Sequence, residues 1–356
     1  MDASTKTGVW IIATGVIVAF LYLGRAFFAP FAMAVFLYLV MEGFARAIDN
    51  RSKILTRSLS RVISILIVTF GFGLYIVLMA RGVAQFGGQA ALYENQINAL
   101  ISDVYAFAHL SDAPTLSDLL FGEPGRRLLA TLGSATSELS ENLILIFLYI
   151  AFLFIAQSNW SLKLDFIFRD GEQREKAREI GKAASRGIET YLWTQTVISF
   201  LTTSLTYATL VLLGAENALF LAALIFVLNY IPTIGSIVAA FIPLLFALVQ
   251  PTLPAWVPGS APESSYIYAT IVFTVVSFWQ FFFGNVVQPR MMGDSLNLSA
   301  LIVLISLAIW GAIWGIPGMF LSAPLTVLMM ILFAQSESTR WVAILLSADG
   351  KPEKGA

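Results

Sequence analysis

One uncharged stretch of the chain is too long to be a single membrane-spanning helix. No Asp, Glu, Lys or Arg occurs between residues 217 and 262, whereas one crossing of a hydrocarbon core of about 30 Å takes about 20 apolar residues. The stretch is interrupted near its middle by Asn229, Pro232 and Gly235. Proline removes a helical hydrogen-bond donor, and glycine tolerates backbone angles that other residues avoid. The pattern predicts two short helices, at about residues 218–230 and 236–249, that meet at a polar break.

Such a break is informative about function in a membrane protein. Irregular backbone at membrane depth is stable only when it is buried in protein or lines a wet cavity, and broken helix pairs often mark the substrate or ion site of a transporter. We therefore expect a buried or re-entrant hairpin over residues 216–250. The alternative is a tight turn between two ordinary tilted spans, with its tip among the lipid headgroups.

Composition places the whole chain in the membrane. Hydrophobic residues make up 58% of the sequence and charged residues 12%, about half the charged fraction of soluble domains. The mean hydropathy is +0.80 and the net charge is −1, which gives no indication of nucleic-acid binding. The sequence has no cysteine, which excludes disulfides and thiolate metal sites. The uncharged runs are too long for a transmembrane β-barrel, so we expect an all-α, polytopic membrane protein.

Hydropathy and loop charge predict about eight spans in addition to the hairpin. Basic residues between positions 42 and 61 place that loop in the cytoplasm under the positive-inside rule, and the later loops then place both termini in the cytoplasm. The predicted spans are residues 8–24, 26–41, 62–80, 142–160, 190–215 and 264–288, with two more in 295–336 that are separated at the sequence GIPG.

Between these spans the composition changes at residues 82–141. Seven acidic residues occur between Arg81 and the start of the fourth span, and apolar residues recur there at helical spacing from Tyr93 to Ala108. We expect an extracytoplasmic insert of amphipathic helices, with a second piece at about residues 126–139. The expected organisation is therefore N-terminal spans (1–81), insert (82–141), fourth span with a charged interfacial helix (142–189), transport core (190–336) and cytoplasmic tail (337–356).

Polar residues on the spans of the core suggest a path for a solute. Gln195, Ser199, Thr202 and Thr206 step by 4, 3 and 4, so they share one helix face. Lipid tails cannot form hydrogen bonds with these side chains, so we expect the face to contact other helices or water. Hydroxyl contacts between packed helices are the alternative to a solute path. The candidates for the path are Asn229, Pro232, Gly235, Gln195, Ser199, Thr202, Thr206, Gln280, Asn285 and Gln288.

Catalytic and cofactor motifs are missing from the sequence. GxxxxGK[ST], HExxH and GxSxG do not occur, which argues against a built-in ATPase, a zinc protease or a serine hydrolase. We expect no enzyme activity, no cofactor and no metal. Glu216 and Asp294 border apolar runs and are candidates for binding a coupling ion such as Na⁺ or H⁺. Six residues are candidate hinges: Pro289, Gly293, Gly315, Pro317, Gly318 and Pro324.

Two sequence blocks resemble a known family. NYIPTIGS at 229–236 and QPRMMGDSLNLSALIVLISLAIWGAIWGIPGMFLSAPLT at 288–326 are similar to the autoinducer-2 exporter family of bacterial inner-membrane proteins. The similarity is strongest from about residue 217 to 332; Ser299 departs from it, because many members carry proline there. The resemblance implies a multi-pass inner-membrane transporter without ATPase parts, as a homo-oligomer, with autoinducer-2 export or Na⁺/H⁺ antiport as the activities found in its branches.

Three hypotheses follow. The leading one is a secondary transporter or facilitative exporter of a small polar solute, with a path beside the broken hairpin. The second is a cation/proton antiporter that uses Glu216 or Asp294. The third is a membrane scaffold whose insert binds a partner.

Overall fold

The chain folds into helices. The computed structural model describes residues 3–51, 56–88, 90–110, 113–121, 142–156, 160–168, 170–258, 263–292 and 297–352. In these ranges the only strand-like pairing is an isolated bridge between Leu298 and Ser347. Five described helices are long and apolar enough to cross a membrane: Arg25–Asp49, Arg57–Gln85, Gly171–Leu212, Glu263–Met291 and Ile316–Ala334. Five shorter apolar helices accompany them: Ile12–Leu23, Asn142–Ala156, Ala218–Leu228, Ile234–Leu248 and Ala300–Trp314. The predicted polytopic helical membrane fold is confirmed.

Two compact units make up the chain. Unit 1 comprises Met1–Ser64, Glu141–Thr194 and Met292–Ala356, and unit 2 comprises Ile65–Ser140 and Gln195–Met291. Two long helices, α3 (Arg57–Gly88) and α8 (Gly171–Leu212), contribute residues to both units.

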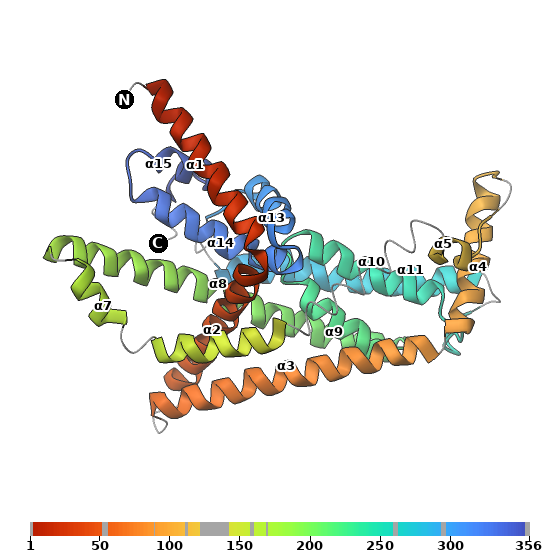
Figure 1. Ribbon diagram of the computed structural model, residues 1–356. Helices are drawn as coiled ribbons and strands as arrows, with labels where there is room; N and C mark the ends of the chain where they lie inside the picture. The colour runs from red at the N-terminus through yellow and green to blue at the C-terminus, as the bar shows by residue number, and fades with distance from the viewer. Residues whose placement is uncertain are drawn as a thin grey trace. The chain divides into compact units, whose positions relative to one another are not determined.

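Unit 1 is organised around its C-terminal helices. α13 (Ala300–Trp314) and α14 (Ile316–Ala334) form a tight hairpin, and α14 also packs against α2 (Arg25–Arg51) and α15 (Arg340–Leu346). α1 (Ala3–Leu23) contacts α2 and α13. Val327 and Ile331 of α14 are buried with Ala184 from the charged half of α8. Figure 1 shows α13, α14 and α15 in blue and α1 and α2 in red.

Unit 2 contains the broken hairpin. α9 (Ala218–Leu228) packs on α10 (Ile234–Leu248), and α10 packs along α11 (Glu263–Phe282), so α10 and α11 lie side by side in Figure 1. Their core buries Leu221 and Ile225 of α9, Ala239 of α10, and Tyr268 and Val272 of α11. Small residues on α9 and α10 let the two short helices approach closely, as is common in membrane interiors.

α8 differs from the prediction. The sequence suggested a charged interfacial helix that ends at residue 189 and a separate span that begins at residue 190. Instead, Gly171–Leu212 is one continuous helix of 42 residues. A short helix, α7 (Trp160–Ile167), precedes it, and Arg178 pairs with Asp165 of α7 at 2.6 Å. No proline occurs in α8, so nothing stops the helical hydrogen bonds where the composition changes from charged to apolar.

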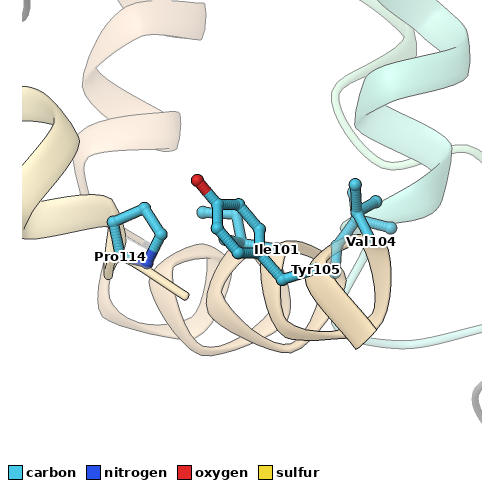
Figure 2. A pocket seen from close by; sticks show the side chains of 5 residues that line it. Ile101, Val104, Tyr105 and Pro114 are labelled. Carbon is cyan, nitrogen blue, oxygen red and sulfur yellow. The ribbon is translucent and has the colours of Figure 1, made fainter. Parts of the chain in front are cut away.

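The predicted insert begins with an amphipathic helix. α4 (Ala90–Phe107) is followed by α5 (Leu116–Phe121), whose first backbone N–H donates to Asn98 Oδ1 at 2.5 Å. Tyr93 is buried, whereas Val104 on the same predicted face is 56% exposed. An open apolar depression of about 220 Å³ lies there (Figure 2). It is lined by Leu100, Ile101, Val104, Tyr105 and Pro114. The second predicted amphipathic piece, residues 126–139, lies outside the described residues.

Candidate functional site

The break between α9 and α10 lies where the sequence predicted it, and its backbone is strained. Thr233 has φ 61° and ψ −59°, and the Ile234 N–H donates to the Pro232 carbonyl at 2.6 Å. This i to i+2 bond around a positive φ is the classic γ-turn geometry, which is rare and strained in proteins. Strain of this kind persists only where the surroundings enforce it, and it is concentrated at functional sites.

Gly235 lets the two short helices meet at this turn. A Cβ atom built on Gly235 would lie 1.8 Å from the carbonyl oxygen of Leu228, the last residue of α9. The neighbouring Tyr230 is buried, and its hydroxyl donates to Thr196 Oγ1 of α8 at 2.8 Å. The break is therefore enclosed by protein on the side that faces α8.

Three of the predicted path residues form a chain of amides at the break. Gln195 Nε2 of α8 donates to the carbonyl oxygen of Asn229 at 2.5 Å. Gln288 Nε2, at the start of α12 (Gln288–Met292), donates to Gln195 Oε1 at 3.2 Å. The structure thus brings together residues from three segments of unit 2, and a backbone carbonyl at the end of α9 is satisfied by a side chain.

Beyond Gln195, the predicted hydroxyl face of α8 is buried. Ser199, Thr202 and Thr206 are each at most 1% exposed, so this face is packed inside the protein. The Thr202 hydroxyl donates to the Ile198 carbonyl of its own helix. In the part of the chain that the structure describes, the hydroxyls of Ser199, Thr203 and Thr206 have no hydrogen-bond partner.

α11 carries further polar groups of this kind. Ser277 Oγ and Gln280 Nε2 are buried and, as far as the described residues reach, have no partner; the same holds for Asn229 Oδ1 at the break. Buried polar groups normally find a partner, so each exception needs an explanation, such as a bound ligand. We call the following residues the polar seam: Gln195, Ser199, Thr202, Thr203, Thr206, Asn229, Ser277, Gln280 and Gln288.

The polar seam contains no ionisable side chain. α8 and α11 are linked by Trp279 Nε1, which donates to Thr209 Oγ1 at 3.1 Å. Between Gln280 and Gln288 the helix widens into the π-helix η1 (Phe283–Val287), a rare form that is frequent at functional sites. The polar seam therefore presents amides and hydroxyls, which can donate hydrogen bonds to an uncharged polar molecule and accept hydrogen bonds from it.

Some predicted residues do not join the seam. Asn285 is exposed, and its amide donates to the Phe281 carbonyl of its own helix. Pro289 is exposed in α12. Gly293 and Asp294 lie outside the described residues. Conversely, Thr203 contributes a buried hydroxyl that the sequence argument did not select, although it lies one helical turn from Ser199 on α8.

Glu216, a candidate for binding a coupling ion, lies at the opposite end of α9 from the break. α9 has 11 residues, or about 16 Å at 1.5 Å per residue. The Glu216 carboxylate accepts from Tyr93 of α4 at 3.2 Å and from Thr252 at 2.5 Å, and its backbone N–H donates to Gln250 Oε1 at 3.0 Å. Burial and the Glu216 charge raise the pKa of Tyr93 to about 12. These contacts attach the insert to the base of the hairpin.

The predicted hinge at GIPG forms the turn between α13 and α14. Gly315 has φ +65°, and Pro317 lies in the first turn of α14, where proline is well tolerated. A Cβ on Gly318 would lie 1.9 Å from the Trp310 carbonyl oxygen, so this hairpin also depends on a glycine at its closest approach. Pro324 is buried inside α14.

Comparison with known proteins shows to which family this chain is related. The family model described as AI-2E family transporter matches residues 11–337. A Haemophilus influenzae protein whose name describes it only as a transport protein is 26% identical to this chain over 352 residues, which is 96% of both chains. A similarly named Borreliella burgdorferi protein is 29% identical over 68% of this chain and 64% of its own length. The AI-2 transport protein TqsA of Escherichia coli is 36% identical over 44% of this chain and 42% of TqsA.

The matched region therefore spans less than two thirds of the length of TqsA and of the Borreliella protein. The family match extends over both units and includes the break, the hydroxyl face of α8 and the GIPG turn. Together with the apolar helices, it identifies a multi-pass membrane protein. The chain belongs to the AI-2E family of transporters.

Proposed function

We propose that the chain is a bacterial inner-membrane secondary transporter or facilitative exporter of a small, uncharged polar solute, which passes along the polar seam of unit 2. The observation that carries this proposal is the amide chain from Gln288 through Gln195 to the Asn229 carbonyl at the strained break. Next to it, Asn229 Oδ1 is a buried acceptor with no described partner. A solute hydroxyl can supply the missing donor.

Autoinducer-2 is the first solute to test. The relative TqsA carries AI-2 transport in its name, and a small polyhydroxylated molecule matches a seam of hydroxyls and amides. Charged solutes are disfavoured, because a buried charge needs a partner of opposite charge and the seam contains no ionisable side chain.

Flux from proteoliposomes loaded with autoinducer-2 tests the proposal. Asn229→Ala leaves the solute hydroxyl without its acceptor, which costs about 1–3 kcal/mol, so we expect the initial rate to fall by about 5- to 150-fold. Pro232→Ala relaxes the break and should also lower the rate. Asn285→Ala is the matched control: it also removes an amide, but one that is exposed and bonded to its own helix. Unchanged flux in both variants, or an equal loss in the control, would exclude the break from the path.

The hinge candidates fit a role in opening this path. Gly235 and Gly318 each let a backbone carbonyl of the preceding helix approach closely, and the turns beside them are the places where a hairpin can tilt without losing its internal hydrogen bonds. We further propose that both termini are cytoplasmic and that the protein assembles as a homo-oligomer. Accessibility labelling of single cysteines introduced into this cysteine-free chain tests the first, and crosslinking in native membranes tests the second.

The described residues offer no observation that favours the scaffold hypothesis. For the antiport hypothesis, the hydrogen bonds that Glu216 accepts from Tyr93 and Thr252 give it a role in fastening the insert to the hairpin.

A further inference from the structure

Unit 1 buries two carboxylates that the transport path does not use. Glu42 of α2 is 3% exposed and Glu189 of α8 is 6% exposed. Removing a carboxylate from water is costly unless a partner compensates, and an ionisable group inside a membrane segment is by default a candidate for function. The two carboxylates differ in how well they are compensated.

Glu189 is fully paired. Arg46 contacts both of its carboxylate oxygens, with Nη2 donating to Oε1 at 2.8 Å. The Ser185 hydroxyl, one turn earlier on α8, donates to the same oxygen at 2.7 Å. Arrangements of this kind, with two donors from one guanidinium and a further hydroxyl, are the strong form of a charge-assisted contact. Both carboxylate oxygens of Glu189 therefore have a positively charged partner.

Glu42 has only an imperfect partner. Arg61 Nε of α3 lies 2.9 Å from Glu42 Oε1, but within the described chain neither atom makes a hydrogen bond of normal geometry. Ser60, the residue before Arg61, is completely buried, and its hydroxyl is likewise without a described partner. One turn further along α3, the Ser64 hydroxyl donates to the Met41 carbonyl of α2. The interface between α2 and α3 therefore contains a buried carboxylate oxygen and a buried hydroxyl that, within the described chain, have no hydrogen bond of normal geometry.

The charges around Glu42 come from three helices. Arg61 faces it from α3, Arg46 lies one turn along its own helix, and Glu189 pairs with Arg46 from α8. Glu42 and Arg46 lie one turn apart on α2, and each is paired with a group from another helix, so the four groups form a single cluster.

The other helices against α2 add no charge near Glu42. α13 and α14 have no charged residue. The titratable residues of α1 are Lys6, near its N-terminus, and Tyr22, over whose ring lies the Arg25 guanidinium at the start of α2. The titratable residue of the apolar helix Asn142–Ala156 is Tyr149, which packs on Phe27 and Phe31; Phe154 of the same helix packs on Tyr38, one turn before Glu42.

We propose that Glu42 is a proton-binding site, and that its protonation is a step of the transport cycle. A proton from water forms an O–H bond on the Glu42 carboxyl, and the ion pair with Arg61 is lost. Arg61 is 32% exposed, so its guanidinium can keep its charge and turn toward water, while the neutral acid can donate to a neighbouring oxygen. Glu189 does not take part, because Arg46 and Ser185 already satisfy it. The second half of this proposal rests on the proposed transport function; the first half does not.

Difference infrared spectroscopy of the purified full-length protein tests the proton site without any solute. A step from about pH 8 to about pH 5, a range in which few ordinary carboxyls in folded proteins titrate, should produce a protonated-carboxyl C=O band. We expect this band to disappear in Glu42→Gln, to remain in Glu189→Gln and to shift in frequency in Glu42→Asp. Arg61→Gln removes the facing positive charge and should raise the midpoint of the band by about 1–3 pH units.

A band that persists in Glu42→Gln, or a protein in which no carboxyl titrates in this range, would overturn the assignment. If Glu42→Gln does not fold, Glu42→Asp and Arg61→Gln decide in its place: an unshifted band frequency and an unshifted midpoint overturn the proposal.

Proteoliposomes containing a trapped pH indicator then test coupling. Addition of an autoinducer-2 gradient should acidify or alkalinise the lumen with the wild-type protein and not with Glu42→Gln, while Glu175→Gln, which changes an exposed residue of α8, behaves as wild type. Solute flux without proton movement in the wild type would refute the coupling and leave the proposed transport function standing. Absence of flux in the wild type would refute the proposed function, and the infrared result would still decide whether Glu42 binds a proton.

Discussion

Gly235→Ala tests whether the close approach at the break holds unit 2 together. In the present geometry the new methyl carbon would lie 1.8 Å from the Leu228 carbonyl oxygen. The obstacle is backbone at the end of α9, which cannot turn aside as the tip of a flexible side chain can. To restore an ordinary contact, α10 must move away from α9 by more than about 1 Å, and overpacking of this kind costs about 1–3 kcal/mol.

The matched control is Gly71→Ala in α3, where no atom lies within 4 Å of the new methyl group. There the substitution should be neutral or stabilising by about 0.5–1 kcal/mol, because alanine loses less backbone entropy than glycine. The two variants should therefore differ clearly in thermal unfolding monitored by tryptophan fluorescence. For a unit of this size, each kcal/mol corresponds to about 2–4 °C in Tm.

The same pair of variants separates the effect on the site from the effect on stability. Displacing α10 should break the γ-turn at Thr233 and the geometry around Asn229, so autoinducer-2 flux should fall in Gly235→Ala even below its melting temperature. A Gly235→Ala protein that has the same Tm as the Gly71→Ala control and transports normally would refute the claim that the two short helices meet through this glycine.

Three further results are expected. Thr233→Gly should raise Tm, because glycine adopts the positive φ of the γ-turn without a Cβ penalty of about 1–2 kcal/mol; a lower Tm would mean that the turn is not strained. Gln195→Ala leaves the Asn229 carbonyl without its donor and should lower flux several-fold. Gln195→Glu should lower flux further, because its carboxylate repels that carbonyl. Equal flux in the wild type and both variants would contradict this expectation. Tyr93→Phe removes a donor to Glu216 and should destabilise the protein by about 0.5–1.5 kcal/mol at neutral pH. Burial and Glu216 raise the pKa of Tyr93 above the ordinary value of 10.0 to about 12. The stability that the neutral phenol contributes is therefore complete below about pH 10 and is lost as pH rises through about 12. This loss should appear in the pH–Tm profile of the wild-type protein and be absent from that of Tyr93→Phe.

The two glycine-dependent turns could be predicted from the local chemistry of their residues. Pro232 and Gly235, and likewise Gly315, Pro317 and Gly318, interrupt long apolar runs. The interruptions are visible in the sequence because proline lacks a donor and glycine lacks a Cβ, properties that need no neighbours. The positions of both breaks and of the apolar helices follow from this local chemistry. The buried hydroxyl face of α8 follows equally from a spacing of three and four residues.

The partners of these residues could not be predicted in the same way. Gln195 meets the Asn229 carbonyl 34 residues away and Gln288 93 residues away, and no periodicity specifies which amide reaches which carbonyl. Glu42 and Glu189 border apolar runs in similar ways, yet packing pairs one completely with Arg46 and leaves the other with an off-axis contact to Arg61. The partners of Glu216, which borders an apolar run in the sequence, are likewise remote: Tyr93 is 123 residues away and Thr252 is 36 residues away.

The helical membrane fold, the broken hairpin and the buried polar stripe could all be predicted from the residues alone, because solvation by lipid acts on each residue through its own hydropathy and its own backbone. Which polar groups have partners and which stay unsatisfied is known only from the folded protein, because hydrogen bonds and ion pairs depend on distances between helices that are remote in the chain. That distinction separates the polar seam of unit 2 from the fully bonded carboxylate at Glu216, and Glu42 from Glu189.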